Sequence, residues 1–409
     1  MTTFVNWVGN QTCRPARRLS PASEAAAQTA VREAIAAGQG VRVVATGHSF
    51  SPVHLTGGTL IDLANLDGIT HVDAPTGRVR ALPGTPIGGF GDPLWDAGLS
   101  LANQGDIDTQ GISGAIGTAT HGSGIRLQSF SASLRGCRIV AGTGEVVVID
   151  ESTPDLLAAA QVAIGMLGVM TEVEIEAVPR YHLVQRIEWW SFARLLDEWD
   201  ERVARHRHFS CFWCPAPESA AMYGLERESG EPTADMAWVK MLDEVDDDGA
   251  PGGRVDRGYR LYPIDSLEPN FHELEYFVHI DRGREAVLAM RELMLASQPD
   301  AVFPLEMRTV AADTAYLSPQ YGMPTLVLSV SGKPGTDYWD YLRSVDALLG
   351  EFDARVHWGK LHFLTAEQLH DRYPKAPAFI GIRRRLDPDG VFLNDHLRPL
   401  FACRCASAA

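Results

Sequence analysis

A histidine on a glycine turn is the first side chain of this sequence whose position suggests chemistry. Residues Val41–Ser51 read VRVVATGHSFS, in which four residues suited to a β-strand lead to Gly47 and His48. Glycine after a strand lets the backbone turn and approach a ligand closely. His48 is therefore expected at the mouth of a loop, where an imidazole can act as a nucleophile or proton carrier. The alternative is a capped imidazole on the surface.

Residues 103–124, NQGDIDTQGISGAIGTATHGSG, form a second stretch with chemical potential. Closely spaced glycines expose backbone N–H groups, and the Ser and Thr hydroxyls add donors beside them. Such loops bind phosphate without many cations. The regular spacing of Ile107, Ile112 and Ile116 argues against the alternative, a loose surface loop.

Glu306 and Arg308 could act on a polar substrate. They are two apart in PLEMRTVAAD, so a strand places both on one face. A carboxylate beside a guanidinium can orient hydroxyl groups, and arginine supplies fixed donors. An ordinary cross-strand ion pair is the alternative. Ser329 and Ser331 in LVLSVSG share a face in the same way.

The surrounding elements indicate an α+β fold. Residues 21–38 predict a helix, and residues 41–45 predict the strand that presents His48. No G-x-G-x-x-G motif opens a helix, which argues against a Rossmann fold. His206 and His208 are expected at an exposed helix end. With 409 residues two domains are expected, and we place their boundary at Pro179, after which the composition changes.

Composition limits the classes of partner. A formal net charge of −16 argues against nucleic acid, whose phosphates attract basic surfaces. The longest apolar run, Leu156–Met170, is broken by polar and glycine residues and is too short to cross a bilayer. Since the N-terminus lacks the pattern of a signal peptide, we expect a cytoplasmic protein without a membrane span.

No metal site is expected. Cys211 and Cys214 have zinc or redox spacing, but in a strand positions three apart point to opposite faces. Residues 242–258 are acidic and rich in glycine, yet they lack the ordered oxygen ligands of a calcium loop. We expect a solvated loop there.

The motifs, in order, resemble the vanillyl-alcohol-oxidase family. VVATGHSF, NQGD, ISGAIGTATHGSG and GMLGVMTEVEIEAVP are similar to its flavin-binding half. Near the C-terminus, HWGKLHF, RYP and RLDPDGVFLNDHL resemble the sugar-1,4-lactone oxidases and dehydrogenases. The resemblance implies an FAD-binding domain of the PCMH type over residues 1–179 and an α+β substrate domain with an antiparallel sheet over residues 180–384. It also implies that residues 385–409 return to the FAD domain.

The resemblance also assigns roles to residues. His48 matches a histidine that many relatives bond covalently to flavin, and Lys360 matches a lysine near the pyrimidine edge of the ring. The implied cofactor-binding residues are Val43, Val44, Ala45, Thr46, Gly47, His48, Ser49, Ser113, Thr118, His121, Gly122, Ser123, Gly124 and Val169. Those implied for catalysis are Glu306, Arg308 and Lys360, and those implied for substrate binding are Ser113, Glu306, Arg308, Ser331 and Lys360.

The expected reaction is removal of hydride from a CH–OH group of an aldono-1,4-lactone, with reoxidation by O2 or another acceptor. An alditol oxidase is the nearest alternative, although Ser329 and Ser331 stand where alditol oxidases tend to have His and Thr. An oxidase of a larger sugar-like substrate and a catalytically idle flavin-binding protein are the others.

Overall fold

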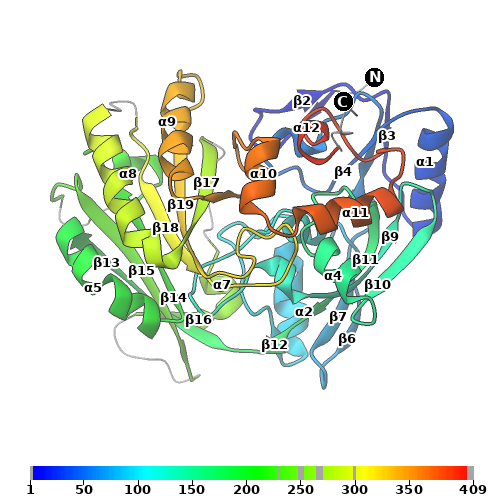
Figure 1. The fold of residues 1–409 in the computed structure, drawn as a ribbon. Coiled ribbons are helices and arrows are strands. Elements are labelled where there is room, and N and C mark those ends of the chain that lie inside the picture. The colour runs from blue at the N-terminus through cyan, green and yellow to red at the C-terminus, as the bar shows by residue number, and fades with distance from the viewer. Residues whose placement is uncertain are drawn as a thin grey trace.

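The computed structural model describes residues 3–225, 227, 230–246, 253–263, 270–297 and 301–402. Two regions lie beside each other, an N-terminal one with several small sheets and a second one built on a single large sheet (Figure 1). Helices and largely antiparallel sheets are combined in one chain, so the expected α+β fold is confirmed. Residues 247–252 of the acidic loop lie outside the described residues. Within the described ranges, no helix is long and apolar enough to cross a membrane.

The N-terminal region has a parallel and an antiparallel sheet with a helix packed between them. Ala27 and Val31 of α1 share an apolar cluster with Val41, Ile61 and Val140 of the two sheets. The strands are β3 (Arg17–Leu19), β5 (Thr59–Asp62) and β4 (Val41–Val44) in the parallel sheet, and β10 (Val146–Asp150), β9 (Leu134–Val140), β11 (Val169–Glu176), β7 (Arg78–Ala81) and β6 (Ile69–Asp73) in the antiparallel sheet. Two short pairs are β1 (Phe4–Val5) with β2 (Thr12–Cys13) and β8 (Leu99–Ser100) with β12 (Val178–Pro179). The helices are α1 (Glu24–Ala36), α2 (Gly91–Asp96), α3 (Ile112–Gly117) and α4 (Pro154–Ala160).

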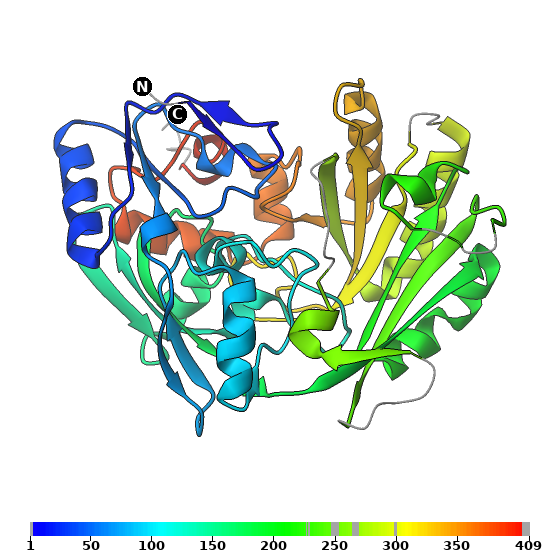
Figure 2. The ribbon, with the colours of Figure 1, turned by 180° about the vertical axis from the view of Figure 1, so that it is seen from behind.

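The second region is an eight-stranded sheet in which all paired strands are antiparallel. Its order is β16 (Arg254–Arg257), β13 (His182–Ser191), β15 (Met236–Val245), β14 (His208–Cys214), β18 (Leu305–Val310), β19 (Thr325–Gly332), β17 (His272–His279) and β20 (Arg355–Val356). Helices α5 (Phe192–Arg205), α8 (Gly283–Ser297) and α9 (Trp339–Gly350) cover one face (Figure 1). Short helices α6 (Ser219–Met222) and α7 (Gly258–Leu261) lie in the connections. The other face is directed toward the N-terminal region (Figure 2).

The C-terminal part returns to the N-terminal region around the predicted boundary at residue 385. Helix α11 (Ala376–Leu386) spans that boundary and packs on α4. Helices α10 (Ala366–Arg372) and α12 (Arg398–Phe401) lie beside it (Figure 1). The amide of Val41 donates to the carbonyl of Val391 at 2.8 Å, which attaches the returning segment to β4.

Arg42 of β4 holds this junction together from inside. Its guanidinium is buried and donates to the carbonyls of Val53 (2.6 Å), Ile164 (2.7 Å), Gly165 (3.3 Å) and Phe392 (2.5 Å). Burial lowers the pKa of Arg42 to about 9, so it is still charged at neutral pH. One side chain therefore joins three segments that are far apart in sequence.

The expectation of an exposed helix end at His206 and His208 is wrong. α5 ends at Arg205, and β14 begins within three residues and runs through the interior of the sheet. His206 is 5% exposed with Nδ1 2.8 Å from Asp243 Oδ2, and His208 is 1% exposed with Nδ1 2.7 Å from the Ser123 carbonyl. Both imidazoles are internal because no loop separates the helix from the strand.

Replacing Arg42 with methionine should lower the free energy of unfolding by about 3 kcal/mol, because several buried carbonyls lose their donor. Urea unfolding of the purified protein measures this. The matched control is Arg17→Met, which removes an exposed pair with Glu33 and should cost less than about 1 kcal/mol. Equal losses in the two variants would contradict the role given to Arg42.

Candidate active site

A cavity of about 560 Å³ lies between the two regions and is lined by both. The N-terminal region contributes parts of residues 42–54, 105–121 and 160–170. The large sheet and the segment after β20 contribute a charged wall, which consists of Glu273, Glu275, Glu306, Arg308, His357 and Lys360. An apolar wall is formed by Phe212, Met222, Tyr223, Leu225 and Phe271.

The turn after β4 places His48 in the cavity. Gly47 has φ +70°, a conformation that glycine adopts without strain, and His48 follows it. The imidazole stacks on Trp7 with ring centroids 4.7 Å apart, and its Nε2 is 3.3 Å from Thr109 Oγ1. Its Nδ1 is buried and has no hydrogen-bond partner among the described residues. Burial, assisted by the charge of Lys360, lowers the pKa of His48 to about 4, so the ring is neutral with a free nitrogen.

The glycine-rich stretch forms the wall beside this turn. Gly111, Ser113, Gly114 and Thr118 line the cavity around α3. A Cβ on Gly111 would lie 2.6 Å from the Cβ of Ala45, so the two loops touch only because a side chain is missing there. A Cβ on Gly114 would meet nothing within 4 Å, so it would enter the cavity space. A cradle left open by glycines, with an unpartnered imidazole at its edge, fits a flavin dinucleotide.

Strand register explains the charged wall. Lys240 of β15 is opposite Ser210 of β14, which is opposite Arg308 of β18. In the neighbouring row Glu306 of β18 is opposite Ser329 of β19, which is opposite Glu275 of β17. Because side chains alternate along a strand, all of these lie on one face, whereas Met307 and Leu328 point toward the helices. The polar face is the one that meets the N-terminal region.

Arg308 is the centre of this wall. Its Nη2 donates to Glu275 Oε2 at 2.6 Å, its Nη1 donates to Asp106 Oδ2 at 3.2 Å, and its Nε is 3.2 Å from Glu306 Oε1. Burial alone would lower the pKa of Arg308, but the surrounding carboxylates, Glu306 first, hold it well above its ordinary value. The cation is fixed from three sides by three separate carboxyl groups.

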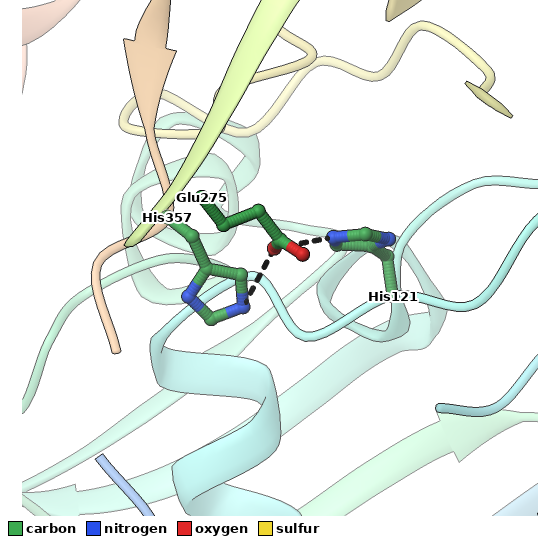
Figure 3. Close-up of side chains that lie close together, drawn as sticks. All are labelled: His121, Glu275 and His357. Atoms are coloured by element: carbon green, nitrogen blue, oxygen red, sulfur yellow. Dashed lines mark hydrogen bonds and ion pairs between the residues drawn. The ribbon is translucent and has the colours of Figure 1, made fainter. Parts of the chain in front are cut away.

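Glu275 also contacts two histidines (Figure 3). Nε2 of His121 is 3.0 Å from Glu275 Oε1, and its Nδ1 is 2.8 Å from the Gly122 carbonyl. The Gly122 carbonyl oxygen and Glu275 Oε1, which face the two ring nitrogens of His121, are both hydrogen-bond acceptors. A proton must therefore lie between His121 Nε2 and Glu275 Oε1. Burial would raise the pKa of Glu275, yet Arg308 and His121 hold it well below its ordinary value. Glu275 is therefore an ionised acceptor held between Arg308 and His121.

The same group offers ligand atoms within 4.8 Å of one another, as a metal site would. Nδ1 of His357 accepts a hydrogen bond from the Gly359 amide at 3.0 Å, so its Nε2 carries the proton and points at Glu275 Oε1, 4.0 Å away. Burial lowers the pKa of His357 to about 3. A protonated Nε2 has no lone pair for a metal, and Arg308 already pairs with Glu275. The donor set of His121, Glu275 and His357 fits a hydrogen-bonded cluster rather than a metal ion.

Two further carboxyl groups complete the wall. Glu273 is ion-paired with Lys360 and accepts a hydrogen bond from Ser329. Burial, with the charges of Asp106, Glu273 and Glu275, outweighs the attraction of Arg308 and raises the pKa of Glu306 to about 8. The neutral form of Glu306 is therefore favoured near neutral pH, and in that form the carboxyl group can donate a hydrogen bond.

Most of the expected site residues meet in this cavity, namely Val43, Val44, Ala45, Thr46, Gly47, His48, Ser49, Ser113, Thr118, His121, Glu306, Arg308 and Lys360. Their roles toward a cofactor or substrate stay predictions. The structure places Gly122, Ser123, Gly124, Val169 and Ser331 outside the lining.

These five residues make their contacts outside the cavity lining. Val169 packs in the cluster of α1, and it is its neighbours Gly168 and Met170 that line the cavity. The segment after His121 turns away to join β18, where the Gly124 amide donates to the Thr309 carbonyl at 2.7 Å. Ser331 Oγ is 2.8 Å from the hydroxyl of Tyr223 and lies behind it.

Sequence reasoning missed Asp106, Glu273 and Glu275, and it gave His357 no role. The signal for the two glutamates was present in HELEYFVH, where they are two apart on one face of an otherwise apolar strand. Asp106 had no comparable signal, because its contact with Arg308 depends on the approach of the two regions.

Comparisons with known proteins agree with this geometry. Residues 173–245 and 248–400 match the family model described as D-arabinono-1,4-lactone oxidase, and residues 15–150 match an FAD binding domain. L-gulono-1,4-lactone dehydrogenase of Mycobacterium tuberculosis is 34% identical, over 96% of this chain and 97% of that protein. Alditol oxidase of Streptomyces sp. is 28% identical, over 98% of this chain and 99% of that protein.

Among solved structures, cholesterol oxidase of B. sterolicum superposes with a TM-score of 0.81. The match covers 98% of this chain and 96% of that one at 14% identity. Such a likeness speaks for the fold alone.

The raised pKa of Glu306 predicts a pH-dependent stability. Between its ordinary pKa and about 8, the folded protein keeps a proton that the unfolded chain has lost. This contribution is complete below the ordinary pKa and disappears as the pH rises toward 8. Glu306→Gln does not titrate, so from about pH 5 to pH 8 its free energy of unfolding should rise relative to wild type by about 1 kcal/mol per pH unit.

Urea unfolding across this pH range measures the difference. Glu367→Gln, at an exposed site in α10, is the control and should run parallel to wild type. If the Glu306→Gln curve is parallel as well, Glu306 is ionised in the folded protein.

Proposed function

The chain belongs to the D-arabinono-1,4-lactone oxidase family, and we propose that it oxidises a CH–OH group of an aldono-1,4-lactone with FAD as cofactor. One observation carries this proposal: the glycine-lined cradle around His48 and the charged wall around Arg308 form a single cavity. A redox cofactor and a polyhydroxylated substrate can therefore meet in one enclosed space.

FAD, when bound, supplies a hydride acceptor at N5 of its ring. The residues placed to hold it are those of the turn Val43–Ser49 and of the stretch 111–118, with Gly165 and Gly168 beyond them. Lys360 adds a positive charge to the lining, which favours a ring that becomes an anion. We assign the cofactor side of the cavity to these residues.

The charged wall is suited to a neutral, oxygen-rich ring. Arg308 presents donors to lactone oxygens, and Glu306 in its neutral form can donate to one oxygen while accepting from a hydroxyl. Arg308 and Lys360 also stabilise negative charge on an oxygen as its proton leaves. The opposite wall of Tyr223, Phe212 and Phe271 excludes water and can pack on the C–H face of a sugar ring.

A linear polyol is the second candidate, since alditol oxidase is among the relatives. The serines where alditol oxidases tend to have His and Thr do not favour it. Ser329 is bonded to Glu273 and Ser331 to Tyr223, so both are already engaged inside the sheet. An oxidase of a larger sugar-like substrate and a catalytically idle flavin-binding protein are the further alternatives.

We further propose that His48 forms a covalent bond to the flavin. Support comes from its neutral ring, its buried and unpartnered Nδ1 and its stacking on Trp7, which together give a nucleophile held in one orientation. Reoxidation by O2 or another acceptor and the cytoplasmic location stay predictions.

Under anaerobic conditions, L-gulono-1,4-lactone or D-arabinono-1,4-lactone should bleach the oxidised flavin of the purified protein, whereas xylitol and sorbitol should not. Absorbance spectra recorded after mixing measure this reduction. Arg308→Met should lower kcat/KM for the lactone about 100-fold, because a fixed cation at the developing charge is lost. Bleaching by polyols alone would refute the lactone assignment, and no bleaching by either class would refute both the lactone and the polyol assignment.

Acid precipitation tests the covalent bond. The pellet of wild-type protein should be yellow, and that of His48→Ala should be colourless with the flavin left in the supernatant. His71→Ala, at an exposed position of β6, should behave like wild type. Wild-type protein that releases all of its flavin has no such bond, and His48 is then a stacking residue only.

A further inference from the structure

Lys240 is a buried cation that the proposed reaction does not use. It lies in β15 on the polar face of the large sheet, is 3% exposed, and lies outside the cavity lining. A lysine is rarely buried so completely, because removing its ammonium group from water is costly unless a counter-charge is supplied. Its position therefore calls for an explanation.

The counter-charge comes from the other region of the protein. Nζ of Lys240 donates to Oδ1 of Asp106 at 3.1 Å and to the carbonyl of Tyr262 at 3.3 Å. It also lies 4.8 Å from the centroid of the Tyr262 ring. Asp106 belongs to the NQGD segment that precedes the glycine-rich wall, so this ion pair joins the cofactor side to the substrate side.

Asp106 divides its two oxygens between two cations. Oδ1 accepts from Lys240 and Oδ2 accepts from Nη1 of Arg308 at 3.2 Å. Burial would raise the pKa of Asp106, but the charges of Lys240 and Arg308 hold it below its ordinary value. The carboxylate is thus a fixed anion with one oxygen for each partner.

This division matters because a carboxylate and a guanidinium prefer to pair through two parallel hydrogen bonds. With Oδ1 free, Asp106 could take two N–H groups of Arg308. The guanidinium would then turn from Glu275, which holds Nη2, and from Glu306, which faces Nε. With Lys240 on Oδ1, Asp106 has one oxygen left for Arg308.

We propose that Lys240 is a positioning residue that limits Asp106 to a single contact with Arg308, and so keeps the guanidinium directed into the substrate side of the cavity. The proposal rests on the proposed function only in that Arg308 binds the substrate. Lys240 thereby affects substrate affinity without touching the substrate.

Steady-state kinetics per bound flavin test the proposal. Lys240→Met should raise KM for L-gulono-1,4-lactone about tenfold and change kcat much less, because a misplaced Arg308 weakens binding. Lys240→Arg, which can still donate to Oδ1, should restore most of the affinity. Lys333→Met, at an exposed lysine, is the matched control and should leave KM unchanged.

A double-mutant cycle separates positioning from general stability. In Asp106→Asn the neutral amide no longer competes for Arg308, so adding Lys240→Met should raise KM no further. If Lys240→Met gives no soluble protein, Lys240→Leu replaces it, since its side chain likewise carries no donor for Asp106 Oδ1. Additive effects, or an unchanged KM in the single variant, would overturn the proposal.

A crystal structure of the Lys240→Met holoenzyme gives a readout that needs no turnover. We expect both Asp106 oxygens on Arg308 and the contact between Nη2 and Glu275 lost. An Arg308 that keeps its wild-type contacts would overturn the proposal whatever the substrate is. Wild-type protein that oxidises no lactone would instead refute the proposed function. The position of Arg308 in the Lys240→Met structure would still decide whether Lys240 is a positioning residue.

Discussion

A single buried guanidinium, that of Arg308, is shared by three carboxyl groups from three parts of the chain. Water cannot stabilise a charge at this depth, so position and protonation of every neighbour are set by the other neighbours. Glu275 stays ionised because it has Arg308 and His121, whereas Glu306 takes up a proton because burial and then the surrounding carboxylates raise its pKa. The chemical character of the cavity follows from this competition.

The sheet that carries Arg308 is buried on both faces, and the two faces differ in what they require. The face under α5, α8 and α9 is apolar and needs only close packing. The other face is charged and needs counter-charges and donors, which the N-terminal region supplies through Asp106 and His121. The C-terminal return and Arg42 hold the N-terminal region together beside that face. The N-terminal region must therefore cover this face to neutralise its charges, as well as to form the cavity.

The sequence predicted what depends on local pattern and missed what depends on the meeting of distant strands. The α+β fold, the strand before His48 and the shared face of Glu306 and Arg308 follow from periodicity and turn chemistry. That Glu275 meets Arg308 depends on the order β18, β19, β17 and on its register, which no local pattern contains.

The error at His206 and His208 has the same origin, and the positions of Val169 and Ser123 are explained in the same way. Each residue was read from its own short segment, whereas its surroundings are set by another segment. Val169 packs on α1, and Ser123 accepts from His208 across the boundary between the regions. A glycine-rich motif shows that a chain can approach a ligand. Gly124, at the end of the motif at residues 103–124, instead forms a β-bridge with Val310 of β18.

The acidic composition of the chain does not describe its cavity, where the charged side chains are paired with one another. The net charge of −16 sums over the whole chain, and the carboxylates at its surface are solvated and screened. Inside, protonation of Glu306 removes one negative charge, and Asp106, Glu273 and Glu275 are each paired with Arg308 or a lysine. Because a field in a site shielded from water is strong over a few ångströms, these few groups outweigh the distant surface. A protein can therefore repel anions at long range and still stabilise one at its centre.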